Sequence, residues 1–221
     1  MAEKITLEWV RMWRNDIDSD KKRVLLVGDS IINMAYKEIH KLLPEGLTSS
    51  KMMTSKGVCC EFLTKEIELV ANQDGGEYEI VYFNNGLHFY NQTPEEYEEN
   101  YRKRLDELKG IIKCDKWILG LSTPITKTVG DPTLGETPIE ANLSIPFDAK
   151  NNIVIEYNKR VMKIAEDYGY DTYDAYSLMV EESHLKVDPY HYNSEGVHLL
   201  AVAVAKKIKE AYEIAGEEMP K

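Results

Sequence analysis

Short apolar runs alternate with longer amphipathic stretches through most of this sequence. The short runs are bounded by glycine or polar residues and are typical of buried strands: residues 23–28, 79–84, 116–121 and 170–174. The longer stretches repeat apolar residues every three or four positions, which predicts helices: residues 31–43, 59–71, 93–110, 154–165 and 194–215. Strands that alternate with helices form a parallel sheet covered on both faces. We therefore expect an α/β protein with a central parallel sheet of about five strands.

Four further segments complete the predicted organisation. A short strand near residues 51–54 supplies the fifth strand, and an amphipathic pattern over residues 5–15 predicts an N-terminal helix. Gly216 is predicted to end the last helix. Residues 122–150 are rich in Thr, Pro and Gly and show no period, which fits either a pocket wall or a surface excursion. We find no linker, and treat residues 1–221 as a single domain.

The composition indicates a soluble protein with reduced thiols. No run approaches the roughly 18 apolar residues that a membrane span needs, and charges interrupt the N-terminal residues, so that no signal peptide is expected. The cysteines, Cys59, Cys60 and Cys114, are odd in number and two are adjacent, which argues against a secreted disulfide framework. We expect a cytoplasmic location.

Charge and motif content exclude several classes of partner. A net charge of −11 without a dense basic run argues against nucleic-acid binding. The histidines and cysteines lack the spacing of a zinc site, and no glycine-rich phosphate motif is present. We expect no metal and no cofactor.

The segment VLLVGDSI, residues 24–31, places Ser30 at a turn from strand to helix. A hydroxyl there lies at the carboxyl end of a sheet strand, beside helix N-terminal amides that favour negative charge. This is a suitable position for a nucleophile. Many α/β proteins end a strand in Gly-Asp-Ser, however, so Ser30 needs a general base elsewhere.

His191 is the strongest of five histidines for that role. In VDPYHYNSEG, Asp188 precedes it by three residues and Pro189 stiffens the turn, so carboxylate and imidazole can face one spot. Taken alone, this segment reads as an Asp-Pro turn with a surface histidine. Together with Ser30 it supplies a nucleophile, a base and a group that orients the base.

Four blocks in order resemble the SGNH hydrolase superfamily, also called GDSL esterases and lipases. They are VLLVGDSI, a glycine 27 positions beyond the serine, the strand end NNGLH, and DPYHYNSEGVHLLA; the resemblance covers residues 22–212. It implies a flavodoxin-like three-layer α/β/α fold and a triad of Ser30, His191 and Asp188. It also implies an oxyanion hole from the backbone N–H groups of Ser30 and Gly57 and a side-chain donor in the third block.

The third block departs from the family pattern Gly-x-Asn-Asp. Here His88 occupies the asparagine place, two residues after Gly86. An imidazole N–H can donate to an oxyanion, but which nitrogen donates depends on the tautomer. Asn85 is a rival donor three residues earlier, and we favour His88 by register. The structural alternative is a loop imidazole bonded to nearby backbone.

These residues lead to one main hypothesis and two alternatives. The main hypothesis is a serine esterase that cleaves a small acyl ester, such as an O-acetyl group on a carbohydrate, through an acyl-enzyme. The first alternative keeps the triad in an acyltransferase or thioesterase. The second is a catalytically silent ligand-binding domain, in which His88 marks a lost oxyanion hole.

Overall fold

The computed structural model describes residues 9–88, 91–114, 116–126 and 147–217. In these ranges six strands form one sheet: β1 (Val10–Arg14), β2 (Lys22–Gly28), β3 (Leu47–Thr54), β4 (Ile80–Asn84), β5 (Trp117–Gly120) and β6 (Asp171–Tyr173). The helices are α1 (Ser30–Leu42), α2 (Phe62–Asp74), α3 (Pro94–Lys109), α4 (Phe147–Tyr168), α5 (Ala175–Glu181) and α6 (Ser194–Glu217), and a short 3₁₀ turn spans Ser183–Leu185. The predicted α/β class is confirmed.

The sheet has the flavodoxin-like strand order. Its strands lie in the order β1-β3-β2-β4-β5-β6, and every neighbouring pair is parallel except β1 with β3. Without β1 the order matches the 2-1-3-4-5 arrangement of flavodoxin-like proteins. The chain leaves β2 for β3 on one side and then crosses to β4 on the other. The boundary between β2 and β4 is therefore the switch point, where folds of this kind bind ligands beyond the carboxyl ends of the strands.

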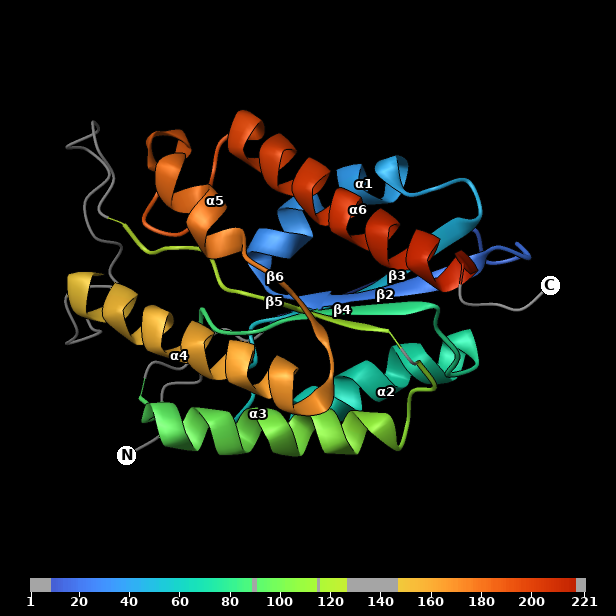
Figure 1. Cartoon of the computed structure of the whole chain (residues 1–221), viewed down its shortest axis with the longest axis horizontal. Helices are drawn as coiled ribbons and strands as arrows, with labels where there is room; N and C mark the ends of the chain where they lie inside the picture. Colours follow the sequence, from blue (N-terminus) through green and yellow to red (C-terminus); the bar gives the residue numbers. More distant parts are fainter. Residues whose placement is uncertain (1–8, 89–90, 115, 127–146, 218–221) are drawn as a thin grey trace.

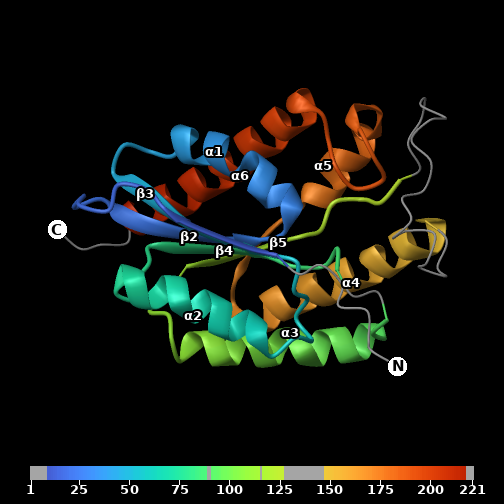
Figure 2. The same cartoon turned by 180° about the vertical axis from the view of Figure 1, so that it is seen from behind.

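Three layers are visible in Figures 1 and 2, with α1, α5 and α6 on one face of the sheet and α2, α3 and α4 on the other. Each face of the sheet carries a hydrophobic core, the first against α1 and α6 and the second against α2 and α3. In β2, Val24 and Leu26 belong to the first core, and Leu25 and Val27 belong to the second. A strand buried on both faces has no polar side, which explains its continuous apolar sequence.

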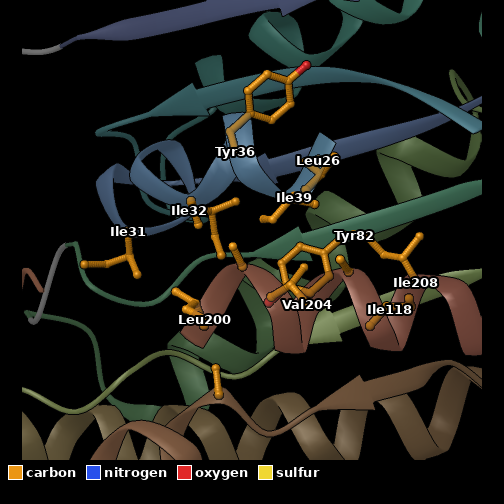
Figure 3. Close-up of a cluster of buried hydrophobic side chains, with 14 of the residues drawn as sticks. Leu26, Ile31, Ile32, Tyr36, Ile39, Tyr82, Ile118, Leu200, Val204 and Ile208 are labelled. Atoms are coloured by element: carbon orange, nitrogen blue, oxygen red, sulfur yellow. The ribbon is translucent and has the colours of Figure 1, made fainter. Parts of the chain in front are cut away.

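The first core is shown in Figure 3. Side chains from three neighbouring strands meet those of α1 and α6, and the residues labelled there are Leu26, Ile31, Ile32, Tyr36, Ile39, Tyr82, Ile118, Leu200, Val204 and Ile208. All of them are at most 4 % exposed. This packing fixes α1, and with it the turn that carries Ser30, against the sheet.

The predicted N-terminal helix over residues 5–15 is wrong in its described part, residues 9–15; residues 1–8 lie outside the described ranges. Val10–Arg14 is strand β1, antiparallel to β3 with Val10 opposite Thr54 and Arg14 opposite Ser50. From Arg11 to Arg14 the burial alternates, since Met12 and Arg14 are partly buried while Arg11 and Trp13 are exposed, which is a period of two. The free edge of β3 supplies backbone partners, and this tertiary pairing outweighs the helical spacing of the sequence.

Three other differences are smaller. The last helix continues through Gly216 to Glu217, so Gly216 does not end it as predicted. Helix α5 and the 3₁₀ turn were not predicted. Of the predicted loop over 122–150, residues 147–150 belong to α4, and residues 127–146 lie outside the described ranges. Among the helices described, none has the length and apolar character needed to cross a membrane.

Candidate active site

Ser30 is the first residue of α1 and follows β2 directly at the switch point. Asp29 caps the helix, since its Oδ1 accepts a hydrogen bond of 2.9 Å from the backbone N–H of Ile31. Gly28 allows strand and helix to approach closely, because an added Cβ would lie 2.8 Å from the Cβ of Ile32. The turn therefore holds Ser30 at the N-terminus of a helix, as the sequence predicted.

Asp188, His191 and Ser30 form a continuous chain of hydrogen-bonding contacts. His191 Nε2 lies 2.8 Å from Ser30 Oγ, across 161 residues of sequence. On the other side of the ring, His191 Nδ1 lies 2.7 Å from Asp188 Oδ2. With Nδ1 protonated toward the carboxylate, Nε2 presents its lone pair to the serine hydroxyl. The structure thus brings together the three residues that the sequence singled out.

The Asp188 carboxylate also organises its own turn. While Oδ2 faces the imidazole, Oδ1 accepts hydrogen bonds of 2.7 Å from the backbone N–H groups of Tyr190 and His191. Burial raises the pKa of Asp188, but the hydrogen bonds from His191 and Tyr190 outweigh it and lower that pKa to about 2. The hydrogen bond to Asp188 in turn raises the pKa of His191. One carboxylate therefore fixes both the loop and the ring.

A short antiparallel arrangement holds this turn in front of α6. The backbone N–H of Val187 donates to the carbonyl of His191 at 3.0 Å, and that of Asn193 donates to the carbonyl of Leu185 at 2.8 Å. Tyr192 is buried in the first core beside Leu185. The loop that carries His191 is thus closed by backbone hydrogen bonds and held by the buried side chains of Leu185 and Tyr192.

The predicted oxyanion-hole residues follow strands on either side of Ser30. Gly57 lies shortly after β3, and His88 shortly after β4, the two strands that flank β2. Since the carboxyl ends of parallel strands meet at one edge of a sheet, all three residues belong to the same rim. His88 is partly buried and is close enough to His191 and Asp29 for their charges to affect its pKa.

Asn85, the rival donor, is engaged with the loop that carries Gly57. Its Oδ1 accepts a hydrogen bond of 3.1 Å from the N–H of Val58, and its Nδ2 donates to the carbonyl of Lys56 at 2.8 Å. Asn85 is itself held because Tyr97 donates its hydroxyl to the Asn85 carbonyl. The side chain of Asn85 therefore clamps the peptide groups on both sides of Gly57.

Asp29 and His88 are two buried or partly buried titratable groups whose charges affect each other, which the sequence patterns do not indicate. Asp29 is 1 % exposed, and its Oδ2 makes no hydrogen bond to any residue that the structure describes. Burial raises the pKa of Asp29, whereas burial lowers the pKa of His88; the charge of each opposes its partner's shift. The Gly-Asp-Ser motif gave a signal for Asp29 only as a helix cap.

Solved structures with similar folds align over most of the chain. The acetylxylan esterase Axe2 from Geobacillus stearothermophilus is 18 % identical, with a TM-score of 0.62 over 85 % of this chain and 94 % of that one. A member of the lipolytic protein G-D-S-L family from Veillonella parvula is 15 % identical, with a TM-score of 0.61 over 84 % and 97 %. The C-terminal catalytic domain of peptidoglycan O-acetyltransferase A from Streptococcus pneumoniae is 19 % identical, with a TM-score of 0.58 over 89 % and 96 %.

The chain has the SGNH hydrolase fold. Its sequence matches no protein-family model and no curated protein. At such low identities the likeness concerns the arrangement of strands and helices, which agrees with the fold that the four sequence blocks implied.

On this SGNH fold, the described start of the predicted 122–150 loop is firmly anchored beside the site. Ser122 exchanges two hydrogen bonds with the Asn158 amide, at 2.8 and 2.9 Å. Ile125 N–H donates to Asn151 Oδ1 at 2.9 Å, and Thr126 N–H donates to the carbonyl of Pro189 at 3.2 Å. The loop after β5 is thereby joined to the Asp188–His191 turn.

Asn158 was missed as a site residue although the sequence carried a signal for it. It sits next to Tyr157 and three residues before Val161, on the buried side of α4, and is 5 % exposed. An amide placed beside an apolar helical stripe needs a buried hydrogen-bond partner. The partner, Ser122, could not be identified from the sequence because it is 36 residues away.

Proposed function

We propose that this protein is a serine esterase that hydrolyses a small acyl ester through an acyl-enzyme. The observation that carries the proposal is the line of contacts from Asp188 Oδ2 through both ring nitrogens of His191 to Ser30 Oγ, at 2.7 and 2.8 Å. A hydroxyl alone is a weak nucleophile, and an oriented neutral imidazole within hydrogen-bond reach is what activates it.

The proposed reaction has two halves. Ser30 Oγ attacks the ester carbonyl carbon while His191 Nε2 takes the hydroxyl proton, and His191 then returns that proton to the oxygen of the leaving alcohol. In the second half, His191 takes a proton from water, whose oxygen attacks the acyl-enzyme carbon; the bond to Ser30 Oγ then breaks, His191 returns the proton to Oγ, and the acid leaves. Asp188 holds the Nδ1–H of the ring throughout and stabilises the imidazolium that forms after each proton transfer.

The proposed oxyanion donors are the backbone N–H groups of Ser30 and Gly57 and the ring N–H of His88. The engagement of the Asn85 amide with the loop around Gly57 favours His88 as the side-chain donor and gives Asn85 a positioning role. Because burial lowers the pKa of His88, its ring is neutral at pH 7 and has one N–H to donate. Each such donor contributes about 10²–10³ in turnover.

We further propose an acetyl ester of a carbohydrate as the substrate class. Two proteins of the same fold are named for acetyl groups on polysaccharides, the acetylxylan esterase and the peptidoglycan O-acetyltransferase. Their likeness is one of fold, so it supports a choice of substrates to test first. A thioester or a longer acyl chain would use the same Ser30 chemistry.

A chain-length series of p-nitrophenyl esters, assayed beside acetylated xylo-oligosaccharides, tests the proposal. We expect the acetyl ester to be the best substrate, and Ser30→Ala to abolish both turnover and labelling by a fluorophosphonate probe. Ser19→Ala is a matched control, since Ser19 lies in the turn before β2 and accepts a hydrogen bond from the backbone N–H of Lys21. Unchanged turnover in Ser30→Ala would refute the mechanism.

The same assays separate the alternatives. An acyltransferase would transfer the acetyl group to an added alcohol or sugar faster than to water, and would still label at Ser30. A silent binding domain would bind acetylated sugars in calorimetry without labelling Ser30 and without turnover.

A further inference from the structure

Lys186 holds three backbone carbonyls from two different loops. Its Nζ donates to the carbonyl of Pro124 at 2.6 Å, to that of Pro189 at 3.0 Å and to that of Tyr190 at 3.4 Å. Pro189 and Tyr190 are the two residues between Asp188 and His191, whereas Pro124 lies in the loop after β5. One ammonium therefore links the turn that carries His191 to the loop after β5.

Within the described residues, the Lys186 ammonium donates to these carbonyls and forms no ion pair with a carboxylate. Among the described residues, no carboxylate oxygen lies within 4.0 Å of Lys186 Nζ. The ammonium lies 4.5 Å from the centroid of the Tyr192 ring, and the charges of Asp188 and His191 also act on it. Carbonyl dipoles and a ring face thus take the place of an ion pair.

Lysine suits this position because its ammonium has three donors and no acceptor. Neither a hydroxyl nor an amide side chain could donate to three carbonyls at once. Since the carbonyls of Pro189 and Tyr190 belong to the peptide groups of the Asp188–His191 turn, losing the Lys186 donors would remove a hydrogen bond from each and loosen the turn. The turn also carries both the Asp188 carboxylate and the His191 imidazole, so its movement would disturb both contacts of the ring.

We propose that Lys186 is a positioning residue for the esterase site, whose charged ammonium holds the Asp188–His191 turn in its working geometry. This inference rests on the proposed function, because Lys186 acts through His191, the proposed base for Ser30. Lys186 does not touch Ser30, so its loss should lower kcat and leave KM nearly unchanged.

A pH dependence follows from the same contacts. Burial lowers the pKa of Lys186 to about 7, opposed by the negative charge of Asp188. Above that pH the neutral amine keeps two N–H donors and loses its charge, so it can no longer hold three carbonyls. Activity should therefore fall on the alkaline side of neutrality, while deprotonation of His191 sets the acid limb.

The experiment compares kcat, KM and their pH profiles for p-nitrophenyl acetate hydrolysis in the wild type and in two variants at this position. Lys186→Met keeps the length of the side chain without donors, and we expect kcat to fall about 10²-fold with KM within a factor of about two. Lys186→Arg stays charged over the whole pH range, so its profile should have no alkaline limb. Lys116→Met is the matched control, because Lys116 also donates to a backbone carbonyl, that of Ala211, at 3.2 Å.

Each outcome either supports or contradicts the positioning role of Lys186. A Lys186→Met enzyme with wild-type kcat and an unchanged alkaline limb would overturn the positioning role. If that variant does not fold, the rate of Ser30 labelling by the fluorophosphonate in the wild type replaces it: a rate that keeps rising with pH through pH 9 contradicts the proposal, and a fall above neutrality supports it. Failure of the proposed function is distinct, since the wild type would then show neither turnover nor labelling of Ser30 at any pH.

Discussion

Gly28→Ala should damage activity more than it damages the fold. The added methyl group would lie 2.8 Å from Ile32 Cβ, and ordinary contact begins near 3.4 Å, so β2 and α1 must separate by at least 0.6 Å. Ile32 Cβ is bonded directly to the backbone of α1, and its side chain packs in the first core, so α1 itself must shift. Because Ser30 starts that helix, the shift stretches its 2.8 Å contact with His191. We expect kcat to fall about 10- to 100-fold, since misplacement by about 1 Å can cost 10²-fold.

The stability cost of this overpacking is about 1–3 kcal/mol, which lowers Tm by about 2–12 °C for a domain of this size. Steady-state kinetics and a thermal melt on the same preparation measure both effects. Gly46→Ala is the control, because its added Cβ would meet only the hydroxyl end of the Tyr212 side chain, at 2.8 Å. Wild-type kcat in Gly28→Ala with a lowered Tm would refute the coupling between the Gly28–Ile32 contact and the position of Ser30.

Three other changes probe the site and the helical layer. His191 acts as a base only when neutral and its pKa is raised by Asp188, so the acid limb of kcat/KM should have its midpoint above the ordinary imidazole value of about 6.5; a lower midpoint would contradict this effect. Asn85→Ala removes the clamp on the Gly57 loop, and turnover should fall about 10²-fold, with a loss of about 1–3 kcal/mol in urea denaturation. Glu98→Gln should destabilise the α3–α4 contact by about 1–2 kcal/mol at pH 7. Burial raises the pKa of Glu98, but the partly exposed Lys163 and Arg102 outweigh this effect and lower that pKa to about 2. That difference should be constant above the unfolded-state pKa of about 4.3 and vanish as the pH falls toward 2.

The helices and parallel strands could be predicted because their patterns are local. In β2, alternate residues enter opposite cores, so the whole run must be apolar. In α3, Thr93 and Glu96 form a reciprocal capping box at the helix start. Both signals depend on residues within a few positions of one another, and the fold class follows from their order.

The edge strand and the supports of the site could not be predicted because they depend on distant partners. Met12 faces inward only because β3 offers a free edge some 40 residues away in sequence. Lys186 reaches Pro124 across 62 residues, and Asn85 reaches Lys56 across 29. A lysine before an Asp-Pro turn and an asparagine after a strand carry no local mark of these contacts. The Asp188–His191 pair was accessible because its two members lie three residues apart and share one turn.

The histidine in the third block responds to the charge of Asp29, the residue before Ser30. An asparagine in that place would offer an N–H at any pH, whereas a histidine would offer one at the correct atom only in one tautomer. Asp29 is buried in the turn before Ser30, and its Oδ2 makes no hydrogen bond to any described residue. Burial lowers the pKa of His88, and the charge of Asp29 opposes that shift without reversing it. The Asp of the Gly-Asp-Ser turn therefore has two effects, since it caps the helix that carries Ser30 and acts through its charge on the pKa of His88.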